Sequence, residues 1–104
     1  MSDPILGFNS KTFTEQLHTR FTVRQASGTV SLELVEVKEP PSPSGIELFT
    51  LLFQGPKTPH LEQKIHNFEH AKLGAFGLFI TAISGDHEGI SYEAVFHRVK
   101  KKER

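Results

Sequence analysis

The 104-residue chain contains neither cysteine nor tryptophan. Without cysteine it can form no disulfide, no thiolate nucleophile and no cysteine-based zinc site, which is compatible with a reducing cytosol. It also has no run of about 18 apolar residues, as a membrane-spanning helix requires, and its N-terminus lacks the basic and apolar regions of a signal peptide. We therefore expect a cytoplasmic protein with no membrane partner.

The chain has no net formal charge, but its charges are unevenly placed. Residues 98–104 carry five basic residues and one acidic residue, so the rest of the chain is mildly acidic. A mildly acidic surface is a poor match for a phosphate backbone, and no basic or aromatic platform elsewhere supports the tail. We therefore predict no nucleic-acid partner and interpret residues 99–104 as a solvated basic tail.

Motifs that mark common active sites are missing as well. The sequence contains no G-x-S-x-G, no G-x-x-x-x-G-K and no H-E-x-x-H. Its six histidines are scattered along the chain. We predict no catalytic residue, no metal site, no cofactor and no enzymatic activity. A weaker hypothesis is a hydrolase or isomerase that uses clustered histidines.

Nine phenylalanines and a two-residue apolar period dominate what the sequence does contain. Such alternation predicts strands with one buried face. After Leu34 the alternation slips by one residue, as at a β-bulge. Six strands are expected, at about residues 21–24, 30–38, 46–54, 61–70, 73–83 and 90–98.

Turn and capping signals divide these strands. Thr12 and Glu15 have the spacing of a capping box, so we expect a short helix at about residues 12–18. The proline-rich stretch 39–45 predicts an exposed loop, and residues 85–89 predict a hairpin turn. The expected domain spans residues 10–98, after a flexible arm at residues 1–9.

The predicted fold class is mainly β. Short connections favour neighbouring strands, so we expect about six antiparallel strands in meander order, forming a small barrel or a strongly curved sheet with one short N-terminal helix. A two-sheet sandwich is the alternative.

Residues 61–70 also fit a helix, and the choice decides whether His66 and His70 form a metal site. On a helix, residues four apart are neighbours and can bind one ion. On a strand they are roughly 13 Å apart, which is too far for two ligands of one metal. We favour the strand. Glu69 and His70 are then expected to have a local turn or hydrogen-bonding role, rather than to form an acid–base pair.

The same periodicity places some apolar residues on the side that faces away from the core. Either the helix or a second sheet covers these residues, or a protein partner binds them. They are Leu48, Leu52, Phe79 and Val95.

Seven short motifs follow one another across about residues 8–97. They are F-x-x-x-L (Phe13 to Leu17), F-x-V (Phe21 to Val23), L-x-L-x-E-V (Leu32 to Val37), F-x-L-L-F-x-G-P (Phe49 to Pro56), E-H-x-x-L-G (Glu69 to Gly74), L-F (Leu78-Phe79) and Y-E-A-V-F (Tyr92 to Phe96). In order and spacing they resemble a family of small bacterial domains of unknown function, often encoded beside phage-tail-collar-like proteins.

The resemblance implies a non-enzymatic protein-interaction or structural module, accessory to a phage-tail-like or tail-collar-like assembly and incorporated into a larger particle. Such a module would work through a protein partner or self-association. The alternative is a small-ligand-binding β-barrel with an aromatic-lined interior. The family commonly has a glycine and an aromatic residue where this chain has Lys64 and His66, and glycine there favours the strand.

Overall fold

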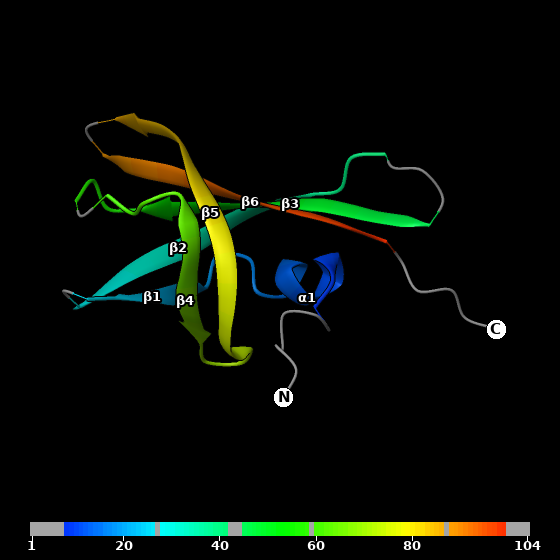
Figure 1. The fold of residues 1–104 in the computed structure, drawn as a ribbon, viewed down its shortest axis with the longest axis horizontal. Coiled ribbons are helices and arrows are strands. Elements are labelled where there is room, and N and C mark those ends of the chain that lie inside the picture. The colour runs from blue at the N-terminus through cyan, green and yellow to red at the C-terminus, as the bar shows by residue number, and fades with distance from the viewer. Residues whose placement is uncertain (1–7, 27, 42–44, 59, 87, 100–104) are drawn as a thin grey trace.

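The two-residue apolar period produces six antiparallel strands in the computed structural model, which describes residues 8–26, 28–41, 45–58, 60–86 and 88–99. The strands are β1 (Arg20–Gln25), β2 (Gly28–Lys38), β3 (Ile46–Gly55), β4 (Lys64–His70), β5 (Gly74–Asp86) and β6 (Gly89–Val99). They close into a barrel in the order β1-β2-β3-β6-β5-β4 (Figure 1). The predicted class, a small β-barrel with one short N-terminal helix, is confirmed.

The predicted meander order is wrong at one connection. β1, β2 and β3 pair in sequence, and so do β4, β5 and β6, but β4 pairs with β1 and β6 pairs with β3. The connection from β3 to β4, of which the structure describes residues 56–58 and 60–63, therefore crosses from one side of the barrel to the other. Within this crossover Leu61 is only 1% exposed. The crossover thus buries Leu61, and β4 pairs with β1 through residues 67–69 rather than with β3.

The helix α1 spans Ser10–Thr14 instead of residues 12–18. Its capping box is formed by Asn9, whose side chain accepts from the Thr12 N–H at 2.9 Å, so the predicted box between Thr12 and Glu15 is wrong. After Thr14 the chain continues as turns. These turns end at His18, whose φ of 65° lies in the left-handed region. A backbone in this region cannot continue a right-handed helix.

The N-terminal arm and the turns are described only in part. Residues 1–7 of the arm lie outside the described residues, as do 42–44 of the proline-rich loop, His87 of the hairpin turn and 100–104 of the tail. Phe8 packs edge-on against Phe13 and Phe76, with ring centroids 5.5 and 5.4 Å apart.

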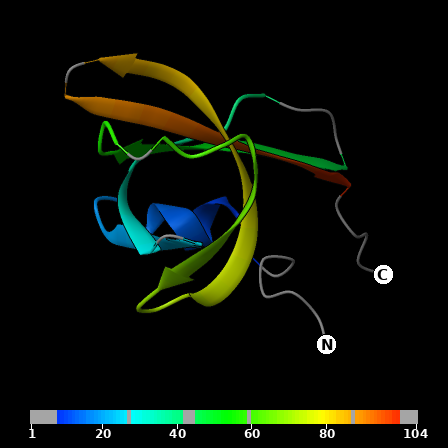
Figure 2. The ribbon, with the colours of Figure 1, turned by 60° about the vertical axis from the view of Figure 1, so that its left-hand side comes forward.

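Two irregularities shape the strands. The register of β2 against β3 shifts between Leu34 and Glu36, which confirms the bulge predicted from the slip in alternation. β5 changes partner along its length, pairing with β4 up to Ile80 and with β6 from Thr81 onward. Figure 2 shows the curvature that this exchange requires. The second irregularity is a shift in the register of β5 against β6, between Ala82 and Ser84.

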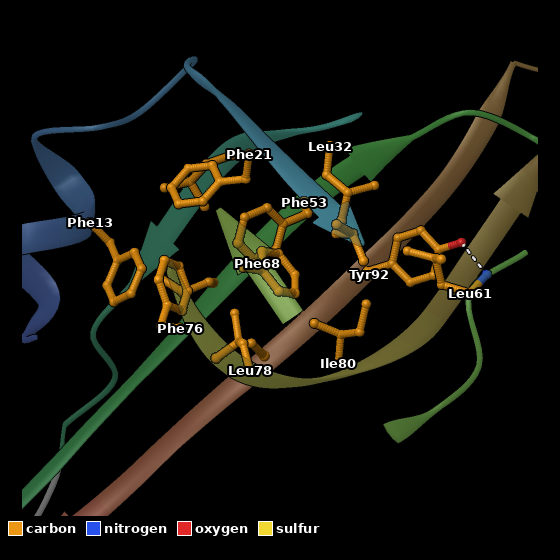
Figure 3. Packing of buried hydrophobic residues seen from close by; sticks show 14 of the residues in the cluster. Phe13, Phe21, Leu32, Phe53, Leu61, Phe68, Phe76, Leu78, Ile80 and Tyr92 are labelled. Atoms are coloured by element: carbon orange, nitrogen blue, oxygen red, sulfur yellow. Dashed lines mark hydrogen bonds between the residues drawn. The ribbon is translucent and has the colours of Figure 1, made fainter. Parts of the chain in front are cut away.

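Side chains fill the barrel from one end to the other (Figure 3). Phe13 of α1 is fully buried at one end, and Leu61 closes the other, where its N–H donates to the Tyr92 hydroxyl at 3.0 Å. Between them, neighbouring phenylalanine rings have centroids 5.3 to 6.5 Å apart, within the range of favourable ring pairs. These middle rings are Phe21, Phe53, Phe68 and Phe76.

The packed rings bear directly on the small-ligand hypothesis. An aromatic-lined binding barrel needs open volume between its rings. Here the described rings contact one another across the interior. The interior of the described barrel therefore gives that hypothesis no support.

Candidate functional site

Apolar residues are exposed on the outside of β4, β5 and β6. Ile65 is 66% exposed, Phe79 48% and Val95 58%. Ile65 and Phe79 are direct cross-strand partners. We call Ile65, Phe79 and Val95, together with the half-buried Leu48 and Leu52 of β3, the outer apolar face. It has two parts, the Ile65–Phe79 pair and Val95 with the two leucines, because β5 pairs with β6 only from Thr81 onward.

The β3 part of this face is continuous with Val95. Val95 lies opposite Thr50, so Leu48 and Leu52 are its diagonal neighbours, within reach of a side chain. Both leucines are half-buried, whereas Phe79 and Val95 are more open. The four residues predicted to face outward therefore do so, but their exposure is unequal.

The helix does not cover the outer apolar face. α1 lies at one end of the barrel and directs Phe13 inward, where its ring packs 5.6 Å from that of Phe96. Phe79 and Val95 thus remain in contact with solvent. For Phe79 and Val95, the first of the two alternatives, coverage by the helix or by a second sheet, is therefore wrong within the part of the chain that the structure describes.

Ile65 belongs to this face but was not predicted there. The apolar spacing of residues 61–68 also fits a helix, in which Ile65 would be buried. In β4 the inward positions belong to His66 and Phe68, so Ile65 faces outward. Gly77 makes room for it, because a Cβ at residue 77 would lie 3.2 Å from the Ile65 Cγ2. Strand alternation from the buried Phe68 was the signal that could have placed it.

His70 joins three segments near the α1 end of the barrel. Its Nδ1 accepts from the N–H groups of Lys72 and Leu73 at 3.0 and 3.2 Å. Its Nε2 lies 2.9 Å from the hydroxyl of Thr19, which donates to the Gln16 carbonyl at 2.7 Å. Since Nδ1 accepts twice, the neutral ring carries its proton on Nε2. Burial, followed by the positive charge of Lys72, lowers the pKa of His70.

Glu69 points away from His70 and serves a different contact. Its carboxylate lies 2.5 Å from the Arg24 Nε across the junction between β1 and β4. The hydrogen bond and charge of Glu69 raise the pKa of Arg24. Because adjacent strand residues face opposite sides, Glu69 and His70 do not form one acid–base pair.

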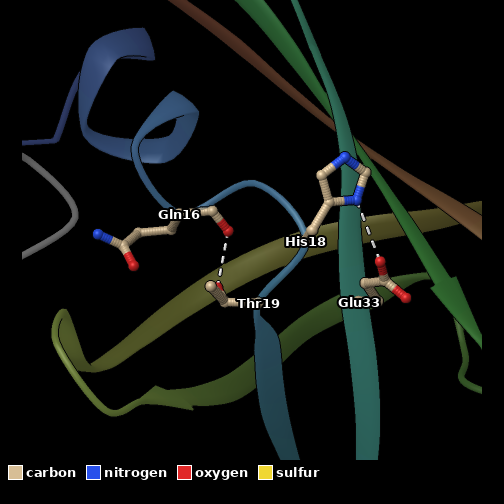
Figure 4. Close-up of polar contacts among 4 residues, drawn as sticks. All are labelled: Gln16, His18, Thr19 and Glu33. Carbon is tan, nitrogen blue, oxygen red and sulfur yellow. Dashed lines mark hydrogen bonds and ion pairs between the residues drawn. The ribbon is translucent and has the colours of Figure 1, made fainter.

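His66 and His18 each have a separate hydrogen-bond partner. His66 is buried, with Nε2 2.7 Å from the Glu62 carbonyl oxygen. His18 lies at the surface with Nδ1 3.2 Å from the Glu33 carboxylate, beside the bond between Thr19 and Gln16 (Figure 4). In the part of the chain that the structure describes, no three histidine or acidic side chains are grouped to hold a metal ion.

An open depression lies at the Leu61 end of the barrel, with a volume of about 610 Å³. Lys57 and His60 of the crossover line one part of it, and Ile83, Gly85 and Ile90 line another. No local pattern in the sequence indicates this depression, because the crossover and β5 are brought together only by the closed barrel. We call it the mouth depression.

The described residues include no helix with the length and hydrophobicity needed to span a bilayer. No curated protein and no solved structure matches the chain. One protein family does match, over residues 8–96, which include all six strands nearly to the end of β6. The chain belongs to this family, which is described as a domain of unknown function, DUF6916.

Proposed function

We propose that this domain is a non-enzymatic interaction module that binds another protein of a phage-tail-like or tail-collar-like assembly through its outer apolar face. The observation that carries the proposal is the exposed cross-strand pair of Ile65 and Phe79, with Val95 also exposed on the same barrel. Clustered exposed apolar side chains are typical of protein-binding surfaces.

The energetics favour a partner at this place. Fully burying a large apolar side chain contributes about 1.5–3 kcal/mol, and aromatic residues are frequent among the residues that dominate interfaces. Phe79 is half exposed, so a partner can still bury a large part of its ring. Burial of this face against a second protein would therefore stabilise the complex.

The filled interior supports an interaction role as well. Rings occupy the centre of the described barrel, and His66 and His70 form hydrogen bonds with backbone groups of nearby residues. The link to a tail-like assembly comes from the motif resemblance set out above. The chemistry of the residues supplies the surface, and the resemblance supplies the kind of partner.

The proposal is tested by capture of the tail-collar-like protein encoded beside the domain, using purified proteins. Phe79→Asp should reduce capture at least tenfold, because it places a charge where the partner excludes water. Thr29→Asp is the matched control, since Thr29 is an exposed strand residue of β2 away from this face. It should capture as the unchanged domain does.

Light scattering of the domain alone tests whether a second copy of the chain binds the same face. A dimer that Phe79→Asp dissociates would make a second copy of the chain the partner. A strict monomer that captures nothing, or equal capture by both aspartate variants, would contradict the proposal.

A further inference from the structure

We propose that the mouth depression is a second binding site, which takes the C-terminal end of an extended partner peptide whose last residue is aliphatic. This site lies apart from the outer apolar face, and each can be tested without the other. Its volume of about 610 Å³ falls in the range of ligand-binding pockets, and the mouths of β-barrels are frequent places for such sites.

The rim of the depression is held in place by the core. Leu61 is 1% exposed and its N–H donates to the Tyr92 hydroxyl at 3.0 Å. The next residue back along the chain is His60, whose ring centroid lies 6.4 Å from that of Tyr92. A rim that is anchored before binding loses less conformational freedom when a ligand arrives.

A bulge in β5 supplies the apolar wall. Ala82 pairs with Tyr92 and Ser84 pairs with Ser91, so Ile83 is the extra residue and has no cross-strand partner. Bulges often re-aim a side chain beside a functional site. Here Ile83 lines the depression and is 48% exposed.

The floor stays open because residue 85 is glycine. A Cβ at Gly85 would lie 3.5 Å from the Ile90 Cγ1, an ordinary contact distance. A larger side chain at this position would therefore cover Ile90 without straining the backbone.

The charges select an anion. Among the lining residues that the structure describes, Lys57 and His60 can carry positive charge and none is acidic, and Lys57 forms no ion pair with another described residue. A carboxylate can accept charge-assisted hydrogen bonds from the Lys57 ammonium and a ring N–H of His60.

The C-terminal residue of a peptide can satisfy both the charged and the apolar part of this depression. The last residue of a chain carries its carboxylate next to its side chain, so an aliphatic side chain can contact Ile83 and Ile90 while the carboxylate meets Lys57. The depression is open to solvent, which leaves room for the rest of the peptide.

The test is fluorescence anisotropy at low ionic strength with the whole chain and a labelled peptide that ends in Leu-Val. The free carboxylate form should bind at least about tenfold more tightly than the same peptide with a C-terminal amide, as expected for loss of a charged hydrogen-bond partner. Lys57→Gln should weaken binding of the carboxylate form to a similar extent. Lys38→Gln, an exposed lysine of β2, is the matched control.

Gly85→Val should abolish binding by covering Ile90, and a thermal melt shows whether the variant is folded. Lys57 is exposed, so its variant keeps the test decisive if Gly85→Val does not fold. Equal binding of the acid and amide forms would overturn the proposal. So would free 3-methylbutanoate binding as tightly as the peptide, because the site would then recognise a small carboxylate. Capture through Phe79 would be unaffected in either case.

Discussion

At the scale of single residues, His70 has the most completely defined hydrogen bonds of the described histidines. Two backbone N–H groups point at Nδ1, and Nε2 faces the Thr19 hydroxyl. Protonation of Nδ1 would set a donor against the N–H groups of Lys72 and Leu73. The neutral ring is therefore part of the folded structure, in agreement with the lowered pKa of His70.

The first prediction is a loss of stability in mild acid. Because the pKa of His70 is lowered in the folded state, the unfolded chain binds a proton more readily. The contribution of His70 is complete above about pH 6.5, the ordinary pKa of unfolded histidine, and is lost as the pH falls toward the lowered folded value. Urea unfolding measured from pH 7.5 downward should show a falling free energy of unfolding.

Two variants show whether His70 causes this fall in the free energy of unfolding. His70→Asn should lower the free energy of unfolding at pH 7.5 by about 1–3 kcal/mol, because its Oδ1 can still accept from the turn N–H groups but the contact with the Thr19 hydroxyl and the packing of the ring against Phe21 are lost, and it should flatten the decline in acid. His18→Asn should keep the decline, and asparagine tolerates the φ of 65° at this position. An unchanged slope in His70→Asn would show that another group titrates.

What the sequence can reveal at this scale depends on the range of the interaction. A turn or hydrogen-bonding role for His70 follows from neighbours two and three residues away, because the accepted N–H groups belong to Lys72 and Leu73. The bond to Thr19 joins residues 51 apart in sequence, and the ion pair of Glu69 with Arg24 joins residues 45 apart. No local pattern indicates either of these two contacts.

At the scale of elements, α1 depends on the barrel for its stability. It has five residues, whereas isolated helices shorter than about 12 residues are marginal in water. Phe13 supplies the missing free energy, because it is fully buried among the rings of Phe8, Phe76 and Phe96. The helix is thus a closure for one end of the barrel.

The second prediction concerns this closure. Phe13→Ala should lower the free energy of unfolding by about 3–5 kcal/mol, as expected for removal of a buried ring. Lys11→Ala changes an exposed residue of the same helix and should stay within about 0.5 kcal/mol of the unchanged chain. Urea unfolding followed by circular dichroism measures both. A cost below about 1 kcal/mol for Phe13→Ala would mean that the ring does not seal the barrel.

Elements differ in how far their sequence defines them. The bulge in β2 was predictable, because a slip in alternation is visible within one strand. The start of α1 was not, since Asn9 with Thr12 and Thr12 with Glu15 have the same spacing. Only the insertion of Phe13 into the barrel decides between these two frames, and that contact is made with distant strands.

At the scale of the whole molecule, the strand order was the part that alternation could not define. Alternation shows which face of a strand is buried, but it does not show which strand lies alongside. The sequence indicated that β3 ends near Gly55 and Pro56, and the structure shows that the following chain crosses the barrel. The burial of Leu61 in this crossover is the contact that a meander would have lost.

This topology makes the junction of β1 and β4 the narrowest in the barrel. It contains three residue pairs, Thr22 with Glu69, Val23 with Phe68 and Arg24 with Asn67. The junction of β3 and β6 has ten. Local opening of a fold follows the regions with the fewest supporting contacts. We therefore predict that the barrel opens first between β1 and β4.

Hydrogen exchange by NMR tests this third prediction. Protected amides between β1 and β4 should exchange at least tenfold faster than those between β3 and β6. Glu69→Gln removes the ion pair with Arg24 and should speed exchange at the narrow junction by a few-fold, and added salt should act in the same direction because it screens exposed charges. Glu62→Gln is the control, since its ion pair with Lys64 lies outside this junction. Uniform exchange around the barrel would mean that it opens only by global unfolding, so that closure between β1 and β4 is as strong as the rest.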